Sequence, residues 1–199
     1  MKIYDISQEV FSCKVFPNDP PPQKRVMMRI ADGEICNLSE FSMCAHNGTH
    51  VDAPYHFIDE GKRLDEVSLE RFVGMAFVAE HQGSISADNA RAMLQRARLF
   101  GFGGEQRILV KGDAVMTEEA AEVFAEAGIL LYGNESQTVG PEDAPAAIHR
   151  IMLGREIVLL EGIRLQAVPE GVYLLNAAPL NLGGCDGAPC RAILIQLHE

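Results

Sequence analysis

The stretch "RILVKGDAVMTEEAAEVFAEAGILLY", residues 107–132, decides the fold class. It opens with a short apolar run, 107–111, and closes with another, 128–132, and their lengths and flanking glycine or charged residues favour buried strands. Between the runs, Thr117 can cap a helix rich in alanine and glutamate, and Gly128 can end it. A strand, a helix and a second strand in this order predict an α/β architecture.

The same alternation extends outward from this stretch. Ser86 can cap an earlier helix, and the segment 141–154 predicts a later one, with Gly154 as the residue that follows its last turn. We therefore expect an α/β fold with a mixed β-sheet and packed helices, formed as one domain by residues 1–199. Further buried strands are predicted at 25–30, 75–80, 156–161, 172–176 and 192–197.

Composition excludes several classes of protein. The formal net charge of −11 argues against a nucleic-acid partner. No apolar run approaches the ~18 residues of a membrane-spanning helix, so no membrane partner is expected. The five cysteines are odd in number and include no CxxC pair, which favours reduced thiols and a cytoplasmic protein.

A second stretch, "AHNGTHVDAPYHF" (45–57), carries the chemistry. His46, His50, Asp52 and His56 fall within eleven positions, and the glycine, β-branched residues and proline among them disfavour a helix. In an extended segment, side chains two residues apart point to the same side. The pattern therefore predicts a metal site, and its imidazole and carboxylate ligands suit Zn²⁺ or Mn²⁺.

The role of each group in this stretch stays open at this level. If His56 stays off the metal, the site keeps an open position and this histidine can transfer protons. Cys44 is close enough to be a further ligand, although a small buried apolar role is expected for it. A thiol-dependent enzyme built on Cys44 is the least favoured class, because only proximity to His46 would lower its pKa.

The motif "HNGTHVDAPYHF" resembles the H-x-G-T-H-x-D-x-P-x-H signature of the cyclase-like metal-dependent hydrolases. The opening "YDISQEV" and the turn "FPNDPP" are similar to the N-terminal strand and proline turn of that family. So are "HRIMLGREIVLLEGIRL" (149–165) and "GVYLLNAAPLNLGGCDGAPCRAILI" (171–195), the latter with a D-G-x-P-x-R-A turn. The resemblance spans nearly the whole chain and is weakest over 80–125.

The resemblance implies the swivelling β/β/α fold of this family and one or two bound divalent ions, Zn²⁺ before Mn²⁺. His56 matches the catalytic acid/base of the family. In two-metal members, the residues matching Asp52 and Glu161 bridge the ions. The positions that match metal ligands are His46, His50, Asp52, His149 and Glu161. His81 and His198 match no motif.

The activity implied is hydrolysis of an amide C–N bond, other than a peptide bond, by metal-bound hydroxide. The family includes bacterial kynurenine formamidases (arylformamidases) and isatin hydrolases, so an aryl formamide resembling N-formylkynurenine is the first substrate expected. A cyclic, isatin-like amide is the alternative, and a metal-binding protein without turnover is a second one. The resemblance also implies a homodimer or homotetramer. No G-x-S-x-G occurs, which argues against a serine nucleophile.

Substrate contacts are predicted at Phe16 and Phe57, as part of an aromatic wall that Phe41 and Tyr55 would extend. Two features depart from the family. Phe16 stands where kynurenine-forming members usually carry tryptophan, which this chain lacks entirely. The loop 133–141 reads "GNESQTVGP" where members often read G-x-D-x-x-S. Both departures concern the substrate and leave the metal site intact.

Overall fold

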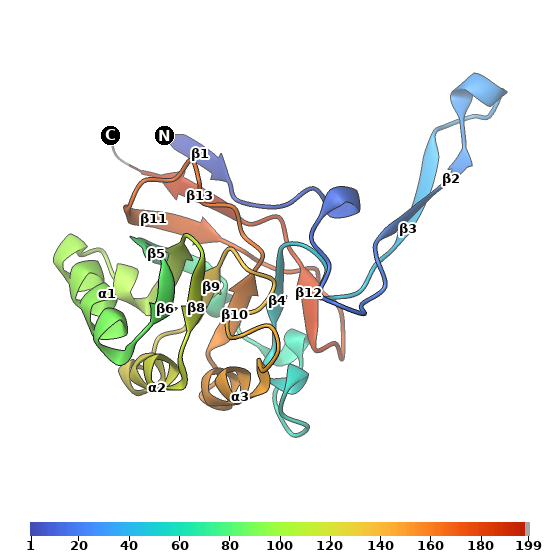
Figure 1. Cartoon of the computed structure of the whole chain (residues 1–199). Helices are drawn as coiled ribbons and strands as arrows, with labels where there is room; N and C mark the ends of the chain where they lie inside the picture. Colours follow the sequence, from blue (N-terminus) through green and yellow to red (C-terminus); the bar gives the residue numbers. More distant parts are fainter. Residues whose placement is uncertain (198–199) are drawn as a thin grey trace.

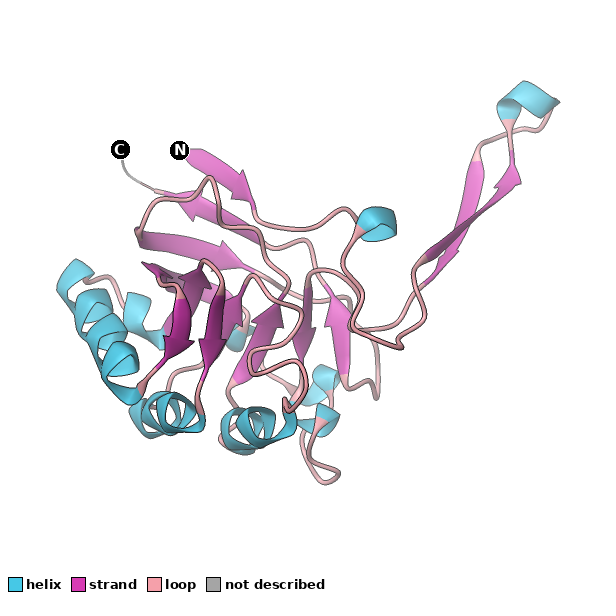
Figure 2. Cartoon of the chain, viewed as in Figure 1, coloured by secondary structure: helices cyan, strands magenta, loops and turns pink. Residues whose placement is uncertain are grey.

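The computed structural model describes residues 1–197 and is built around one mixed β-sheet (Figures 1 and 2). The order of its strands across the sheet is β1 (Lys2–Asp5), β13 (Ile193–Gln196), β11 (Gly171–Asn176), β5 (Val73–Glu80), β7 (Arg107–Lys111), β9 (Leu131–Asn134), β10 (Val158–Glu161), β4 (His50–Asp52) and β12 (Gly187–Pro189). Strands β5, β7, β9 and β10 run parallel, and the strands flanking them pair antiparallel. The predicted mixed α/β sheet is confirmed.

The helices α1 (Ala87–Phe100), α2 (Glu118–Ala127) and α3 (Ala146–Gly154) are ordered as the sequence predicts. The hydroxyl of Ser86 accepts the Asn89 N–H, and Thr117 accepts the Ala120 N–H. The prediction for α3 was wrong at both ends. The helix begins at Ala146, because the ring of Pro145 would clash with the carbonyl four residues earlier in a longer helix. At the other end, Gly154 is the last residue of α3, whereas the prediction places it just after the helix.

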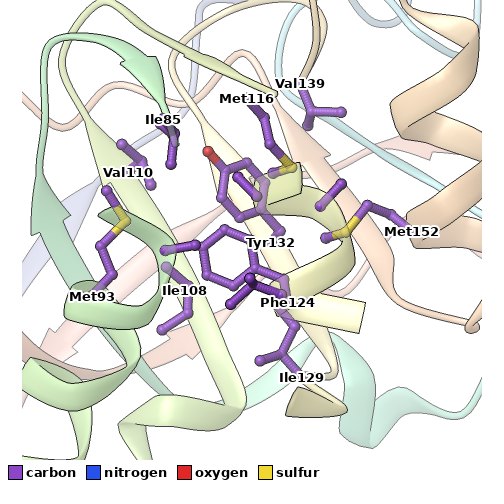
Figure 3. Close-up of a cluster of buried hydrophobic side chains, with 14 of the residues drawn as sticks. Ile85, Met93, Ile108, Val110, Met116, Phe124, Ile129, Tyr132, Val139 and Met152 are labelled. Carbon is purple, nitrogen blue, oxygen red and sulfur yellow. The ribbon is translucent and has the colours of Figure 1, made fainter. Parts of the chain in front are cut away.

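The sheet is buried on both faces. Alternate residues of β7 separate: Ile108 and Val110 pack toward the helices, while Leu109 packs on the opposite face. On the helix side, Phe124 of α2 packs on Tyr132 of β9, with ring centroids 5.4 Å apart (Figure 3). On the opposite face one apolar cluster contains residues of both β1 and β4, so the sheet curls and brings its distant strands together.

The strands β2 (Gln23–Met28) and β3 (Leu38–Ser42) form an antiparallel ribbon that projects from the body (Figures 1 and 2). The strand predicted at 25–30 is present but runs over Gln23–Met28, and its expected burial was wrong. Val26 is 44% exposed and Met27 is 43% exposed. A short apolar run has the same composition in a buried strand and in an exposed one, so the local sequence does not reveal whether the strand is buried.

Smaller elements complete the described chain. Strands β6 (Gly83–Ile85) and β8 (Ala114–Met116) form a short parallel pair beside the main sheet. Within residues 1–197, no helix combines the length and apolar character that crossing a membrane requires. The 3₁₀ turns are η1 (Val10–Ser12), η2 (Ile30–Asp32), η3 (Pro54–His56), η4 (Leu64–Glu66), η5 (Leu69–Arg71) and η6 (Gly104–Gln106).

Candidate metal centre and active site

Strand β4 lies between β10 and β12 and aligns the polar side chains of the site. In the antiparallel register, His50 is opposite Glu161 of β10, and Asp52 is opposite Gly187 of β12. Val51, between them, points into the apolar cluster on the other face. The alternation of a strand thus places one carboxylate and one imidazole on the same face, directly beside a second carboxylate.

Helix α3 supplies the second imidazole of this buried group. His149 projects from α3 and is 3% exposed, while Asp52 is fully buried and Glu161 is 2% exposed. The His149 Nε2 atom lies 3.2 Å from Glu161 Oε1 and 3.6 Å from Asp52 Oδ2. The His50 Nε2 atom lies 3.3 Å from Asp52 Oδ1 and 3.4 Å from Glu161 Oε2. Two histidines therefore direct the same ring nitrogen at two shared carboxylates.

His46 joins the group from a turn before β4. Its Nδ1 atom lies 2.9 Å from Asp52 Oδ1. The segment 46–56 is turned and only partly extended, because Gly48 has a φ of +66° and only His50–Asp52 is strand. Gly187 makes room for the ring, since a Cβ there would lie 2.7 Å from His46 Cε1.

Backbone carbonyls fix the orientation of the two buried rings. The Nδ1–H of His50 donates to Gly48 O at 3.0 Å, and that of His149 donates to Pro145 O at 2.8 Å. When the Nδ1–H of a histidine is held in this way, Nε2 is the ring nitrogen whose lone pair can bind a metal. Both rings are therefore prepared to bind a cation through Nε2.

His56 lies at the end of η3 and meets a carboxylate that the motif analysis does not assign. The Nδ1–H of His56 donates to Asp186 Oδ2 at 3.1 Å, and the same oxygen accepts from His46 Nε2 at 2.8 Å. The His56 ring also stacks on His46, with centroids 3.9 Å apart. The only signal of Asp186 in the sequence is the D-G-x-P turn, whose Asp186 lies 130 residues beyond His56.

The loop 133–141 forms hydrogen bonds with residues of the site. Gln137 Nε2 donates to Gly48 O at 2.9 Å, the carbonyl that also orients His50. The Val139 N–H donates to Glu161 Oε1 at 2.9 Å. Glu135 accepts the N–H groups of Gly112 and Leu165, and so fixes the loop to its surroundings. This loop therefore orients candidate ligands, a role that its sequence does not reveal.

The carboxylates shift the pKa values of the histidines strongly upward. Burial alone would lower the pKa of each ring, but hydrogen bonds to Asp52 and a second carboxylate outweigh it. They raise the pKa of His46 to about 9, and the pKa values of His50 and His149 to about 10. For Asp52 the direction is reversed. Burial would raise the pKa of this carboxyl group, but hydrogen bonds from the neighbouring histidines hold it well below its usual range.

Cation binding should therefore release protons at pH 7. Below about pH 9 to 10 the three rings carry an extra proton in the cation-free protein, and a ring must lose it before its nitrogen can bind a metal. The apparent affinity for Zn²⁺ should rise, and the proton release should fall, as the pH approaches that range. Calorimetry in buffers of different ionisation enthalpy measures the release. Binding at pH 7 without proton release would contradict this expectation.

The donor set fits a divalent cation. Among residues 1–197, nitrogen and oxygen atoms within 4.8 Å of one another occur in the groups His46–His50–Asp52 and Asp52–His149–Glu161, which share Asp52. Asp52 Oδ2 is buried without a hydrogen-bond partner, which is the environment expected of an oxygen that binds a cation. A third group joins His46, His56 and Asp186, but Asp186 Oδ2 already accepts two hydrogen bonds.

Of the predicted substrate contacts, the structure brings only Phe57 to the cluster. Its ring packs on His149, with centroids 4.4 Å apart, and lies perpendicular to the His56 ring, with centroids 4.6 Å apart. Phe16 is half-buried and forms no ring-stacking pair within residues 1–197. Phe41 is 57% exposed on the projecting ribbon. The substrate roles of Phe16 and Phe57 stay predictions.

The remaining candidates lie apart from the cluster. Cys44 Sγ contacts Asp19 Oδ2 at 3.8 Å and belongs to none of the three groups of possible metal ligands found within residues 1–197. His81 contacts Ser84 O through Nε2 at 3.1 Å and also lies outside these groups. His198 lies outside the described residues.

Comparisons with known proteins show the family and the fold to which the chain is similar. The family model named Cyclase matches residues 4–141. A kynurenine formamidase of Salinibacter ruber is 33% identical over 98% of this chain and 97% of its own, and one of Paracidovorax citrulli is 30% identical over 96% and 95%. A solved structure described as a "predicted metal-dependent hydrolase" from Bacillus stearothermophilus is 27% identical, with a TM-score of 0.78 and 97% of both chains covered.

An isatin hydrolase bound to the product analogue thioisatinate has the same fold. Its TM-score is 0.82, over 97% of this chain and 91% of its own. The identity is 17%, so this likeness concerns the arrangement of the strands and helices alone.

Proposed function

This chain belongs to the Cyclase family, and from that premise we propose that it is a metal-dependent hydrolase that cleaves the amide C–N bond of an aryl formamide. The observation that carries the proposal is the largely buried cluster of three imidazoles and two carboxylates with His56 beside it. The relatives named kynurenine formamidase, which match almost the whole chain, favour a substrate resembling N-formylkynurenine.

Each group in the site has a distinct role in this proposal. His46, His50, Asp52, His149 and Glu161 would hold the metal. When bound, a divalent cation supplies Lewis acidity toward a carbonyl oxygen and lowers the pKa of water toward about 7. Zn²⁺ is the first choice and Mn²⁺ the second, since the ligands are imidazole and carboxylate. The two groups that share Asp52 leave room for one ion or two.

His56 moves the proton that hydrolysis requires. Its Nδ1–H is held by Asp186, so Nε2 is the atom left to exchange protons. Water adds its oxygen to the formyl carbon, the C–N bond breaks, and the products are formate and an aryl amine. His56 Nε2 takes a proton from the attacking water and delivers one to the leaving nitrogen. Phe57 packs against His56 and His149 and excludes water from the face of the two rings that it covers.

Two alternatives are separated by experiment. A cyclic amide such as isatin requires the same attack on a carbonyl, and the shared fold of isatin hydrolases keeps it as the second candidate. A metal-binding protein without turnover is the third. Metal-loaded protein should be assayed on N-formyl aryl amines, isatin and related imides. We expect the highest kcat/KM on a formamide; a preference for isatin would move the assignment to cyclic amides, and no turnover would favour pure binding.

Asp186 should influence both metal affinity and turnover. Its carboxylate holds His46 and His56 together, and loss of a carboxylate that orients a ligand histidine typically costs about 10–100-fold in affinity or activity. Asp186→Asn should weaken Zn²⁺ binding and lower kcat within that range, with KM changed less. Equilibrium dialysis and steady-state kinetics measure the two effects, and Asp186→Glu should recover part of both. Unchanged affinity and kcat would remove this role.

The remaining assignments are extensions of the proposal. One domain is formed by residues 1–199, and it assembles as a homodimer or homotetramer. The cytoplasmic location and the lack of a nucleic-acid partner stay predictions from the sequence.

A further inference from the structure

Two glutamines, Gln8 and Gln137, meet beside the backbone of the segments that carry the candidate ligands. Gln8 Nε2 donates to Gln137 Oε1 at 2.7 Å, although the two residues are 129 positions apart. Gln8 lies between β1 and η1, and Gln137 lies in the loop that follows β9. Both side chains are half-buried, and neither residue belongs to the groups of possible metal ligands found within residues 1–197. The amide pair thus joins two loops beside the site.

Each glutamine donates to a carbonyl oxygen next to a candidate ligand. Gln137 Nε2 donates to Gly48 O at 2.9 Å, and this oxygen also accepts the Nδ1–H of His50 at 3.0 Å. Gln8 Nε2 donates to Gly162 O at 2.8 Å. Gly162 directly follows the last residue of β10, which is itself a candidate ligand. The pair therefore contacts both ligand segments, one just before β4 and one just after β10.

The neighbours of each amide fix which end is the nitrogen. Gln8 Oε1 accepts the Lys14 N–H at 2.8 Å, so Nε2 is the atom that faces Gly162 O. Gln137 Nε2 faces Gly48 O, and its Oε1 faces Gln8 Nε2. If either amide were reversed, its oxygen would lie against a carbonyl oxygen. The surroundings therefore set the direction of donation, from Gln8 to Gln137 and from Gln137 to Gly48.

The space around the pair leaves little freedom for it to shift. Gly162 has a φ of +68°, and a Cβ there would collide with Gly48 O and with both glutamine side chains. The Gly162 N–H donates to Ser136 O at 2.7 Å, and its carbonyl oxygen also accepts the Thr49 hydroxyl at 2.7 Å. Close packing of this kind passes a displacement of one group to its neighbours. A change in either glutamine should therefore move the carbonyl that orients His50.

From these contacts we infer that Gln8 and Gln137 are positioning residues of the metal centre, which together hold the Gly48 carbonyl where it fixes the His50 ring for a divalent cation. The inference rests on the metal site of the proposed function. It adds that the segment around Gln8, which supplies no candidate ligand, sets the geometry of the bound ion. Groups that orient ligand histidines typically change metal affinity by about 10–100-fold.

Neutral variants of similar length test the inference. Gln8→Met and Gln137→Met remove the amide groups and keep most of the side-chain volume. Each should raise the Zn²⁺ dissociation constant by about tenfold or more, measured against a competing chelator, and should shift the visible absorption bands of the Co²⁺-loaded protein. Because Gln8 acts partly through Gln137, the double variant should lose less affinity than the product of the two single losses. Losses that simply multiply would overturn the pairing.

A charged variant, Gln137→Glu, separates hydrogen-bond donation from packing. It keeps an oxygen that accepts from Gln8 but loses the N–H that donates to Gly48 O. Its negative charge by itself favours a nearby cation, so a weaker affinity would not be a charge effect. We expect it to bind Zn²⁺ as weakly as Gln137→Met does. Wild-type affinity with an unchanged Co²⁺ spectrum would overturn the inference.

A glutamine outside the site provides the matched control. Gln82 Oε1 accepts the Asp113 N–H at 3.0 Å, and Gln82→Met should leave the Zn²⁺ dissociation constant and the Co²⁺ spectrum unchanged. The unfolding midpoint of each metal-free variant is measured as well. A lower midpoint with wild-type Zn²⁺ affinity in the Gln8 and Gln137 variants would show a purely structural role and overturn this inference alone. A wild-type chain that binds no Zn²⁺ would overturn the proposed function with it.

Discussion

Replacing His56 with alanine should lower kcat for formamide hydrolysis by about 10²–10⁴-fold while the bound metal stays at the wild-type level. The reason is that proton transfer and metal binding are carried out by different residues of the site. His56 lies outside the two buried groups that share Asp52, and its Nδ1–H is engaged by Asp186. Loss of its ring removes the group that takes a proton from water and returns it to the leaving nitrogen. Steady-state kinetics and metal analysis of the same preparation measure the two effects.

Two further variants make this result interpretable. His56→Gln keeps a hydrogen-bonding side chain of similar length and should remain as inactive as the alanine variant, because an amide does not exchange protons in this way. His81→Ala removes a histidine that contacts Ser84 O outside the cluster, and it should retain full activity. If His56→Ala keeps both its metal and its rate, the proton role belongs to another group.

Replacing Asp52 with asparagine should remove both the metal and the activity. Asp52 is fully buried, contacts all three cluster histidines and belongs to both buried groups. Loss of an outer carboxylate costs about 10–100-fold in metal affinity, so loss of the central one should cost more than about 100-fold. Dialysis against a metal buffer followed by elemental analysis measures the affinity, and hydrolysis should fall in parallel.

The matched control is Asp88→Asn, which removes the same charge from an exposed pair with Arg91 on α1. It should bind metal and turn over substrate as the wild type does. Circular dichroism of the Asp52 variant checks that its fold is retained. A folded Asp52→Asn protein with wild-type metal content would contradict the central position given to this carboxylate.

The parts of the fold that depend on local chemistry could be predicted from the sequence. Ser86 and Thr117 cap helices because their hydroxyls reach backbone N–H groups three residues ahead. The central strands could be found because burial on both faces requires continuous apolar runs. The start of α3 was misplaced because the acids before Pro145 resemble a first turn, although the proline ring prevents one.

The rest depends on contacts between distant parts of the chain. Asp186 reaches His46 across 140 residues, and Gln137 reaches Gly48 across 89. Neither residue has a neighbour in sequence that reveals its partner. The exposure of β2 is likewise decided by which surface covers it, and not by its composition. The ligand positions could be proposed because a family motif carries them, while their buried geometry required the strand register of β4 with β10 and β12.

The central claim is that amide hydrolysis by this chain depends on a cation in the buried cluster. It is tested most directly by removing metal with a chelator, adding Zn²⁺ or Mn²⁺ stepwise, and following bound metal and N-formyl aryl amine hydrolysis in the same samples. The account predicts that hydrolysis is lost on removal and returns in proportion to the metal bound. Hydrolysis that persists without metal, or a fully loaded protein with no hydrolysis, would contradict it.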